Sequence, residues 1–240
     1  MDIGWSVVHL EYELFSEKPD NIYSRYMKEI PNVIKHCVGM GDYWKNIFCI
    51  RSPFDLDLSF QLENNKVIID NSDDFELDNF EKQGLHFLTN NPETYGQYPL
   101  IQIPLSQFFI SDKPCKVELI PPIGDLHLNP MWSFIRFGSG EIDIHAWQRP
   151  INFAFEWIDT TKKIHIKKGE PLIYAKFHSK NINETFKIKE LEFDGDVKKL
   201  FTRCISSREL LKKGTRDLIN MARRKRDKNV VGKCPYKFDI

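Results

Sequence analysis

The stretch that decides the fold is residues 149–177, RPINFAFEWIDTTKKIHIKKGEPLIYAKF. Phe153, Phe155 and Trp157 alternate with smaller or polar residues, which is the period-two pattern of a half-buried strand. A polar turn leads from this strand into a second one. The tripeptide Gly169-Glu170-Pro171 then predicts a tight turn into a third strand, because glycine accepts a positive φ and proline marks a strand start. Three strands in succession predict an antiparallel β architecture.

The rest of the first 190 residues continues this pattern of short apolar segments separated by turn residues. We predict strands over residues 5–14, 54–60, 67–69, 100–103, 108–110 and 116–120, and a short helix over residues 21–30. Short strands with such punctuation are typical of a sandwich or a barrel. We therefore predict a mainly β domain over residues 1–190, either an antiparallel β-sandwich or a jelly-roll or β-clip-like barrel. The acidic segment 70–98 is expected to be a long loop that caps one end of the sheet or a pocket.

The last part of the chain, residues 191–240, is basic, although the whole chain has zero net charge. Residues 1–120 hold 10 Lys+Arg and 19 Asp+Glu, whereas residues 121–240 hold 24 and 15. Ser206 and Glu209 have the spacing of a capping box, so we predict one helix or two short helices over residues 206–226. The basic run RRKR at residues 223–226 suits a solvated helix end, or docking on the acidic half of this chain or of a second copy. A homo-oligomer formed through this extension is therefore one predicted partner, and contact with nucleic acid is the less favoured alternative.

Cysteine usage and hydropathy bear on location. The five cysteines, at positions 37, 49, 115, 204 and 234, show no CxxC spacing. This pattern indicates free thiols in a reducing compartment and argues against a zinc site. We expect no membrane span, because no apolar run approaches about 18 residues, and no secretory signal, because a basic region followed by an apolar one is missing at the N-terminus. These features predict a cytoplasmic protein.

The segment GEIDIHAW places three candidate metal ligands at alternate positions. Glu141, Asp143 and His145 would point from one face of a strand. Two carboxylates and an imidazole on one face could bind a divalent metal or position a water. The other interpretation, which we favour, is an ordinary solvated strand face.

Arginines beside aromatic residues suggest an anion site. Arg149 follows Trp147 closely, and the planar fork of arginine suits a phosphate or a carboxylate. Arg51 invites the same interpretation, and for it too a structural ion pair is the alternative. The alternative is structural, with Arg149 pairing with Asp55 or Asp57. A ligand site is predicted from the following residues together: Arg51, Asp143, His145, Trp147 and Arg149.

The central part of the chain resembles an uncharacterised family of bacterial and phage proteins. The motifs that carry the resemblance are Trp147-x-x-Pro150, Phe153-x-Phe155 and Gly169-Glu170-Pro171. The resemblance implies a β fold and a phage-type origin, without an assigned reaction. The order of Gly140-Glu141-Ile142-Asp143 and the later Gly169 turn is also similar to the dUTPase and dCTP-deaminase superfamily. The serine motif that holds phosphate in that superfamily is absent here.

These observations favour a non-enzymatic binding or interaction protein. The ligand they suggest is a phosphorylated small molecule such as a nucleotide, through the dUTPase-like resemblance, and no cofactor is assigned. One alternative is a metal-assisted nucleotide hydrolase or a cupin-like enzyme that uses Glu141, Asp143 and His145. Another is a virion or structural component that assembles through β edges. A phage-encoded protein would act in the host cytoplasm.

Overall fold

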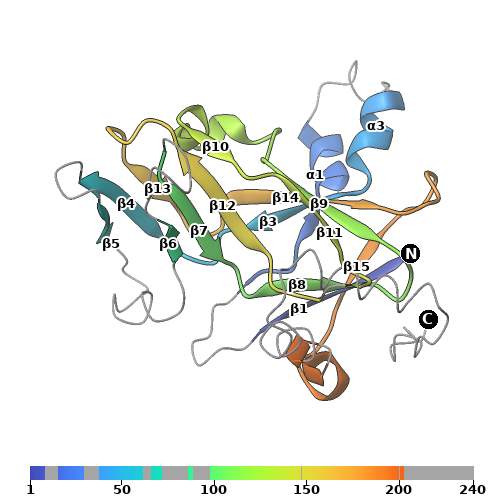
Figure 1. Cartoon of the computed structure of the whole chain (residues 1–240). Helices are drawn as coiled ribbons and strands as arrows, with labels where there is room; N and C mark the ends of the chain where they lie inside the picture. Colours follow the sequence, from blue (N-terminus) through green and yellow to red (C-terminus); the bar gives the residue numbers. More distant parts are fainter. Residues whose placement is uncertain are drawn as a thin grey trace.

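The chain folds as a β-sandwich in a computed structural model (Figure 1). The structure describes residues 1–8, 16–29, 38–61, 66–71, 86–88, 98–146, 148–199 and 201–202. Within these residues the strands form four sheets, and the sheets lie in two layers with apolar side chains between them. None of the described helices has the length and apolar character needed to span a bilayer.

One layer consists of a three-stranded and a four-stranded sheet. The first has the order β15 (Lys187–Glu190), β1 (Asp2–Val7), β8 (Gln107–Ile110). The second has the order β10 (Ile135–Phe137), β12 (Asn152–Trp157), β7 (Leu100–Pro104), β6 (His86–Leu88). Two backbone hydrogen bonds join these sheets, from Leu105 N to Ile151 O and from Ile151 N to Gln107 O. β7 and β8 therefore run as one bent ribbon past β12.

The other layer is built in the same way from a five-stranded and a three-stranded sheet. The five strands are β11 (Gly140–Asp143), β9 (Lys116–Ile120), β14 (Pro171–His178), β3 (Ile47–Arg51) and β2 (Asp20–Asn21), in that order. The three strands are β13 (Ile164–Ile166), β4 (Leu56–Gln61) and β5 (Lys66–Asn71). Reciprocal backbone bonds of 2.8 Å, from Ser52 N to Glu170 O and from Gly169 N to Ser52 O, join them at the corner. Gly169 has a φ of 82°, which explains why glycine occupies this turn.

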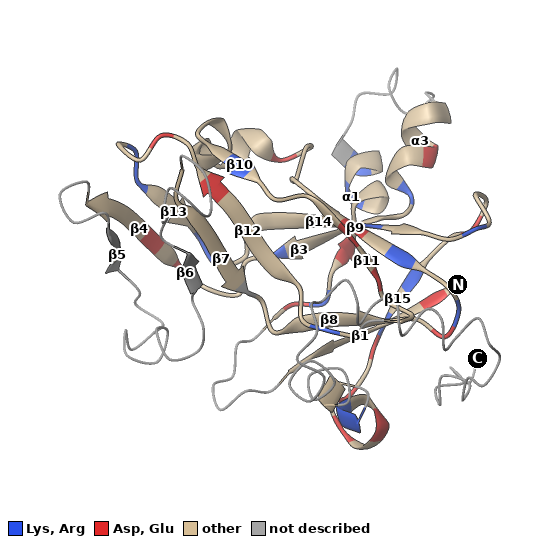
Figure 2. Cartoon of the chain, in the orientation of Figure 1, with Lys and Arg blue, Asp and Glu red and all other residues tan. Residues whose placement is uncertain are grey.

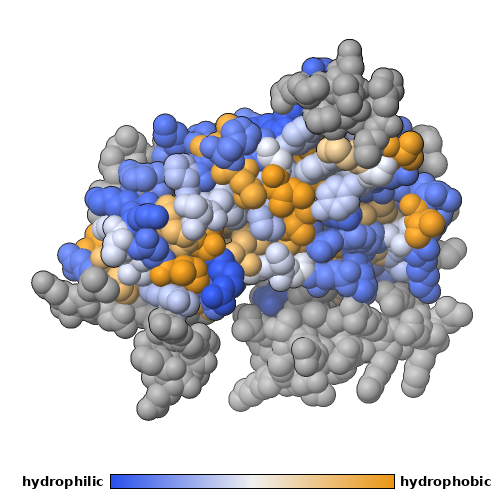
Figure 3. Space-filling view, turned by 90° about the horizontal axis from the view of Figure 1, so that it is seen from above, coloured by the Kyte–Doolittle hydropathy of each residue, from blue (hydrophilic) through white to orange (hydrophobic). Residues whose placement is uncertain are grey.

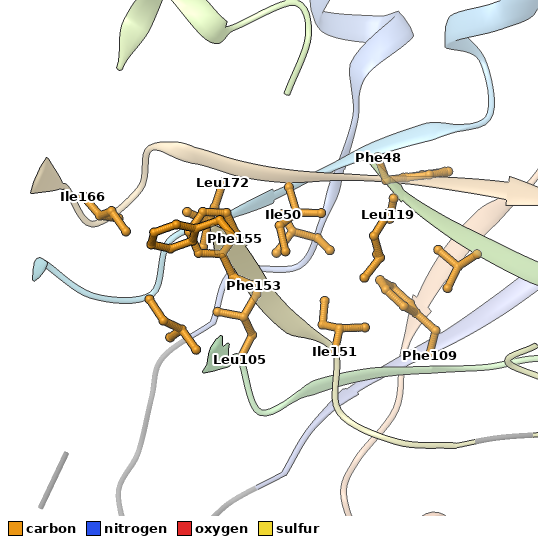
Figure 4. Packing of buried hydrophobic residues seen from close by; sticks show 14 of the residues in the cluster. Phe48, Ile50, Leu105, Phe109, Leu119, Ile151, Phe153, Phe155, Ile166 and Leu172 are labelled. Atoms are coloured by element: carbon orange, nitrogen blue, oxygen red, sulfur yellow. The ribbon is translucent and has the colours of Figure 1, made fainter. Parts of the chain in front are cut away.

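The main core lies between the two layers. Phe153 and Phe155 of β12 face Ile50 and Leu172 of the opposite layer, as Figure 4 shows. A second cluster lies on the outer face of the five-stranded sheet, beneath α1 (Ile22–Glu29) and α3 (Val38–Trp44). A third cluster covers the outer face of β1 and β8, where Phe108 packs on a segment whose residues 195–199 and 201–202 are helical.

The three strands expected in residues 149–177 are confirmed, but they do not pair with one another. β12 pairs with β7 and β10, β13 pairs with β4, and β14 pairs with β3 and β9. The predicted helix over residues 21–30 is confirmed as α1, and the predicted strands over residues 54–60 and 67–69 are confirmed as β4 and β5, which pair with each other. The first strand begins earlier than predicted, at Asp2, and its pairing with β15 is parallel, so the architecture is not purely antiparallel.

Two predicted segments lie largely outside the described residues. Of the expected long loop at 70–98, the structure describes the end of β5 and the strand β6, which pairs with β7, and residue 98. The predicted helical region at 206–226 and the basic run at 223–226 fall entirely outside the described part of the chain.

Candidate functional site

The three candidate metal ligands do not share one strand face. β11 ends at Asp143, and residues 144–146 form a turn. Glu141 is exposed and forms an ion pair with Lys116 on β9. Asp143 is buried, and its carboxylate accepts a hydrogen bond of 3.1 Å from Ala146 N. The predicted alternation from 141 to 145 is therefore wrong, because the Asp143 side chain closes a turn that ends the strand.

His145 lies beyond the strand and is fixed against a different element. Its Nδ1 is 2.9 Å from the carbonyl oxygen of Ser111, directly after β8. Gln148 Nε2 donates 2.9 Å to His145 O, which closes the loop. Within the residues that the structure describes, no group of three or more His, Cys, Asp or Glu side chains is placed to hold a metal ion.

Arg51 lies far from the other predicted ligand residues. It is paired in register with Pro171, at the start of β14. Asp143 is paired with Lys116, which neighbours His178 at the other end of β14. Seven residue steps along a strand correspond to about 23 Å. Arg51 and Asp143 therefore do not line one pocket.

The fork of Arg51 is also occupied within the fold. Its Nη1 donates 2.9 Å to Gly169 O, and its Nε lies 3.3 Å from Asp20 Oδ1. The structural role that sequence reasoning weighed against phosphate binding is thus the one observed for this arginine.

Trp147 and Arg149 are the remaining residues of the predicted ligand site. Trp147 lies outside the described residues, and Arg149 precedes β12 in a segment without regular structure. The two acids proposed as partners of Arg149 have other contacts. Asp57 is 2.8 Å from His165 Nδ1, and Asp55 accepts a bond from Lys168 N.

A different site emerges at the loop between β9 and β10. Residues 123–128, which we call the 123–128 turn, include the 3-10 turn η1 (Leu126–Leu128). Asp125, at its centre, is nearly buried. Its Oδ2 accepts 2.5 Å from Arg25 Nη2 on α1 and 2.6 Å from the hydroxyl of Tyr174 on β14. The turn is thereby tied to both a helix and the central strand.

The pKa values of Arg25 and Tyr174 are both shifted by the burial of this network and by its hydrogen bonds. Burial opposes the charge on Arg25, but the neighbouring Asp125 carboxylate outweighs this effect and raises the pKa of the guanidinium. Burial, together with the hydrogen bond to Asp125, raises the pKa of the Tyr174 hydroxyl far above its ordinary value. The guanidinium of Arg25 is therefore charged and the Tyr174 hydroxyl is protonated at any physiological pH.

A glycine brings the turn against α1. A Cβ atom added at Gly124 would lie 1.4 Å from the hydroxyl oxygen of Tyr26. Any side chain at position 124 would force the Tyr26 ring to shift, so glycine allows the backbone of the turn to lie against Tyr26 in its present position. Tyr26 in turn stacks on Trp44 of α3, with ring centroids 5.0 Å apart.

Asn129 fixes the far end of the turn. Its Nδ2 donates to His165 O at 2.8 Å and to Glu170 Oε2 at 3.0 Å, and its Oδ1 accepts from Met131 N at 3.0 Å. His165 O belongs to β13, which is the last strand of its sheet. Asn129 therefore also covers a strand edge that would otherwise present an unpaired carbonyl.

Between these two anchors the turn exposes aliphatic side chains. Ile123, Leu126 and Leu128 keep 42%, 38% and 52% of their surface in contact with solvent. Figure 3, seen from the side of α1 and α3, shows apolar surface near the middle of this face between hydrophilic areas. Large aliphatic side chains gathered on an exposed, rigid loop are typical of an interaction surface.

Sequence reasoning missed this site. The segment PPIGDLHLNP contains two prolines, a glycine and an Asn-Pro pair, which are all typical of a turn or loop. The signal was the placement of Ile123, Leu126 and Leu128 among those turn residues. A short turn, unlike a helix or a strand, has no regular buried face to take up apolar side chains.

Comparisons with known proteins leave the chain without an assigned family: no protein-family model matches it, and no curated protein matches it. The resemblances noted from the sequence therefore stay predictions.

Proposed function

We propose that this protein works by binding another protein, and that the 123–128 turn is its docking element. The observation that supports this proposal is the exposure of Ile123, Leu126 and Leu128 on a turn fixed by Asp125 and Asn129. A preordered turn loses little conformational entropy on binding, so most of the free energy of contact contributes to affinity.

The apolar surface that Ile123, Leu126 and Leu128 leave exposed is large enough to contribute substantially to binding affinity. Complete burial of an isoleucine or leucine side chain contributes about 1.5–3 kcal/mol. Between 38% and 52% of each of the three residues remains exposed. Covering this remainder would contribute about 2–4 kcal/mol in total, which corresponds to roughly 30- to 1,000-fold in affinity. This is the size of contribution expected from the centre of a protein interface.

The geometry supports this proposal better than recognition of a phosphorylated small molecule. That alternative relied on Arg51 together with Asp143 and His145. Arg51 contacts Asp20 and Gly169 instead, at the opposite end of β14 from Asp143. The class of function predicted from the sequence, a binding or interaction protein, is kept, and its ligand is revised.

Site-specific photocrosslinking tests the proposal. A benzophenone amino acid is placed at position 128 of the full chain, in the cells that naturally make the protein. The matched control carries it at Ile182, which is 88% exposed in the loop after β14. We expect a discrete conjugate from position 128 that is absent from position 182 and that weakens with Leu126→Ser. Equal labelling from both positions, or none from position 128, would contradict the proposal.

A further inference from the structure

The 123–128 turn alone is too small to hold a partner. A specific protein interface covers about 800 Å² on each of the two proteins. Ile123, Leu126 and Leu128 keep only 42%, 38% and 52% of their surface exposed, so these three side chains supply a fraction of that area. A protein that docks on the turn must therefore also contact the surface beside it.

On the side of β13, the surface beside the turn is charged, and its charges contact one another. β13 adjoins the turn where Asn129 Nδ2 donates to His165 O. His165 Nδ1 is 2.8 Å from Asp57 Oδ1. Lys162 Nζ is 3.4 Å from Asp159 Oδ2. Because the centres of protein interfaces are depleted in charged residues, we do not expect the apolar contact to continue in this direction.

On the side of α1 and α3, the surface beside the turn is aromatic. The backbone of the turn lies against Tyr26 of α1 at Gly124. The Tyr26 ring stacks on Trp44 of α3 at 5.0 Å, and the Tyr43 ring packs edge-on against Trp44 at 5.3 Å. Tyr43 remains 38% exposed. Adjoining aromatic rings therefore connect the turn to the exposed face of α3.

α3 exposes apolar side chains where a surface helix typically carries charged ones. Its sequence, VGMGDYW, has a single charged residue, Asp42, which pairs with Lys45 at 2.8 Å, and Figure 2 shows the rest of the helix as uncharged. Val38 is 77% exposed. Lys176 Nζ lies 4.1 Å from the centre of the Tyr43 ring, a cation–π contact that holds the ring in place. Tyrosine, tryptophan and methionine, which α3 all contains, are enriched at protein interfaces.

We propose that the protein that docks on the 123–128 turn also covers α3, with Val38 and Tyr43 as its contacts there. This inference rests on the proposed function and adds the second part of the docking surface. The partner is a protein other than a second copy of this chain, and its contact surface is apolar and broad enough to reach from a loop to the neighbouring helix. The Tyr43 ring, held by Lys176, loses little conformational freedom on docking.

Crosslinking from α3 tests whether one partner covers both parts of this surface. The benzophenone amino acid is placed at position 38 of the full chain, in the cells that naturally make the protein, and Ile182 again serves as the exposed control position. We expect position 38 to capture the same protein that position 128 captures, as peptide mass mapping of the two conjugates would show. Position 182 should not capture it.

The variant Tyr43→Ser shows whether α3 and the turn contribute to one contact. It carries the crosslinker at position 128, and we expect the yield of the conjugate to fall on the order of tenfold. The control is Tyr43→Phe, which keeps the aromatic ring beside Lys176 and should leave the yield unchanged. Circular dichroism melting of both variants establishes that they fold, and the position 38 experiment decides the question should Tyr43→Ser unfold.

Each outcome decides one of the two claims. The α3 contact is overturned, while the docking role of the turn stands, if position 38 captures no protein or a different one. The same holds if the yield from position 128 falls with Leu126→Ser but is unaffected by Tyr43→Ser. A conjugate of twice 28.3 kDa that contains only this chain makes the occupant a second copy and overturns both claims. No conjugate from position 128 overturns the proposed function, and the inference with it.

Discussion

Replacing Asp125 with alanine tests whether the buried network fixes the 123–128 turn. The substitution removes the acceptor that Arg25 and Tyr174 share, at 2.5 and 2.6 Å. The Arg25 and Asp125 side chains are only 19% and 11% exposed, so water cannot fully replace the lost carboxylate. Breaking a buried ion pair costs about 3–5 kcal/mol. Because part of Arg25 reaches solvent, we expect a loss of about 3 kcal/mol in the free energy of unfolding.

Equilibrium unfolding in guanidinium chloride, followed by tryptophan fluorescence, measures this loss. Trp44 reports directly on the network, since its ring packs edge-on against Tyr174 at 6.1 Å. The matched control is Asp42→Ala, which removes a 65% exposed partner of Lys45 and should cost less than about 0.5 kcal/mol. The reasoning is refuted if Asp125→Ala destabilises the protein no more than Asp42→Ala does. A double-mutant cycle with Tyr174→Phe should give a coupling energy of about 1–2 kcal/mol.

Two further predictions concern the contact between Gly124 and Tyr26 and the two buried cysteines, Cys49 and Cys115. Gly124→Ala should cost about 1–3 kcal/mol, because its Cβ would overlap Tyr26, whereas Gly140→Ala, with no atom within 4 Å of the added Cβ, should not show this overlap penalty in the same unfolding assay. Burial raises the pKa of both Cys49 and Cys115 to about 12 from an ordinary value of 9.0, so neither should react with iodoacetamide at pH 8 until the protein unfolds, as peptide mass mapping would show. Since these thiols hold their protons more tightly when folded, their contribution to stability should be complete below pH 9 and be lost between about pH 9 and 12, and rapid native-state labelling of either cysteine would contradict this.

Local patterns in the sequence were sufficient to predict most strands but not their partners. The alternation of Phe153, Phe155 and Trp157 identified β12, and the glycine turn identified the start of β14. Alternation reports which side of a strand is buried, and it carries no information about the neighbour to which the backbone bonds. The neighbours of β12, β13 and β14 are strands from elsewhere in the chain, so consecutive strands separated into three sheets.

The candidate site was harder to predict because single side chains decided the local backbone. In GEIDIHAW, the period-two pattern runs through position 145, but the carboxylate of Asp143 accepts a bond from Ala146 N and ends the strand. Asp125 and Asn129 look like ordinary loop residues in the sequence. Their roles depend on Arg25, Tyr174 and Glu170, which are distant in the chain and become neighbours only in the fold.

The affinity of the crosslinked partner for a variant of the 123–128 turn, compared with its affinity for a control variant elsewhere on the surface, tests the central claim most directly. Leu126→Ser/Leu128→Ser removes apolar surface that docking would cover, whereas Ile182→Ser removes apolar surface at the far end of β14. Isothermal titration of the purified partner should show binding weakened about 10- to 100-fold by the double leucine variant and unchanged by Ile182→Ser. Equal affinity for the double leucine variant and the wild-type protein would contradict the assignment of the 123–128 turn as the docking element.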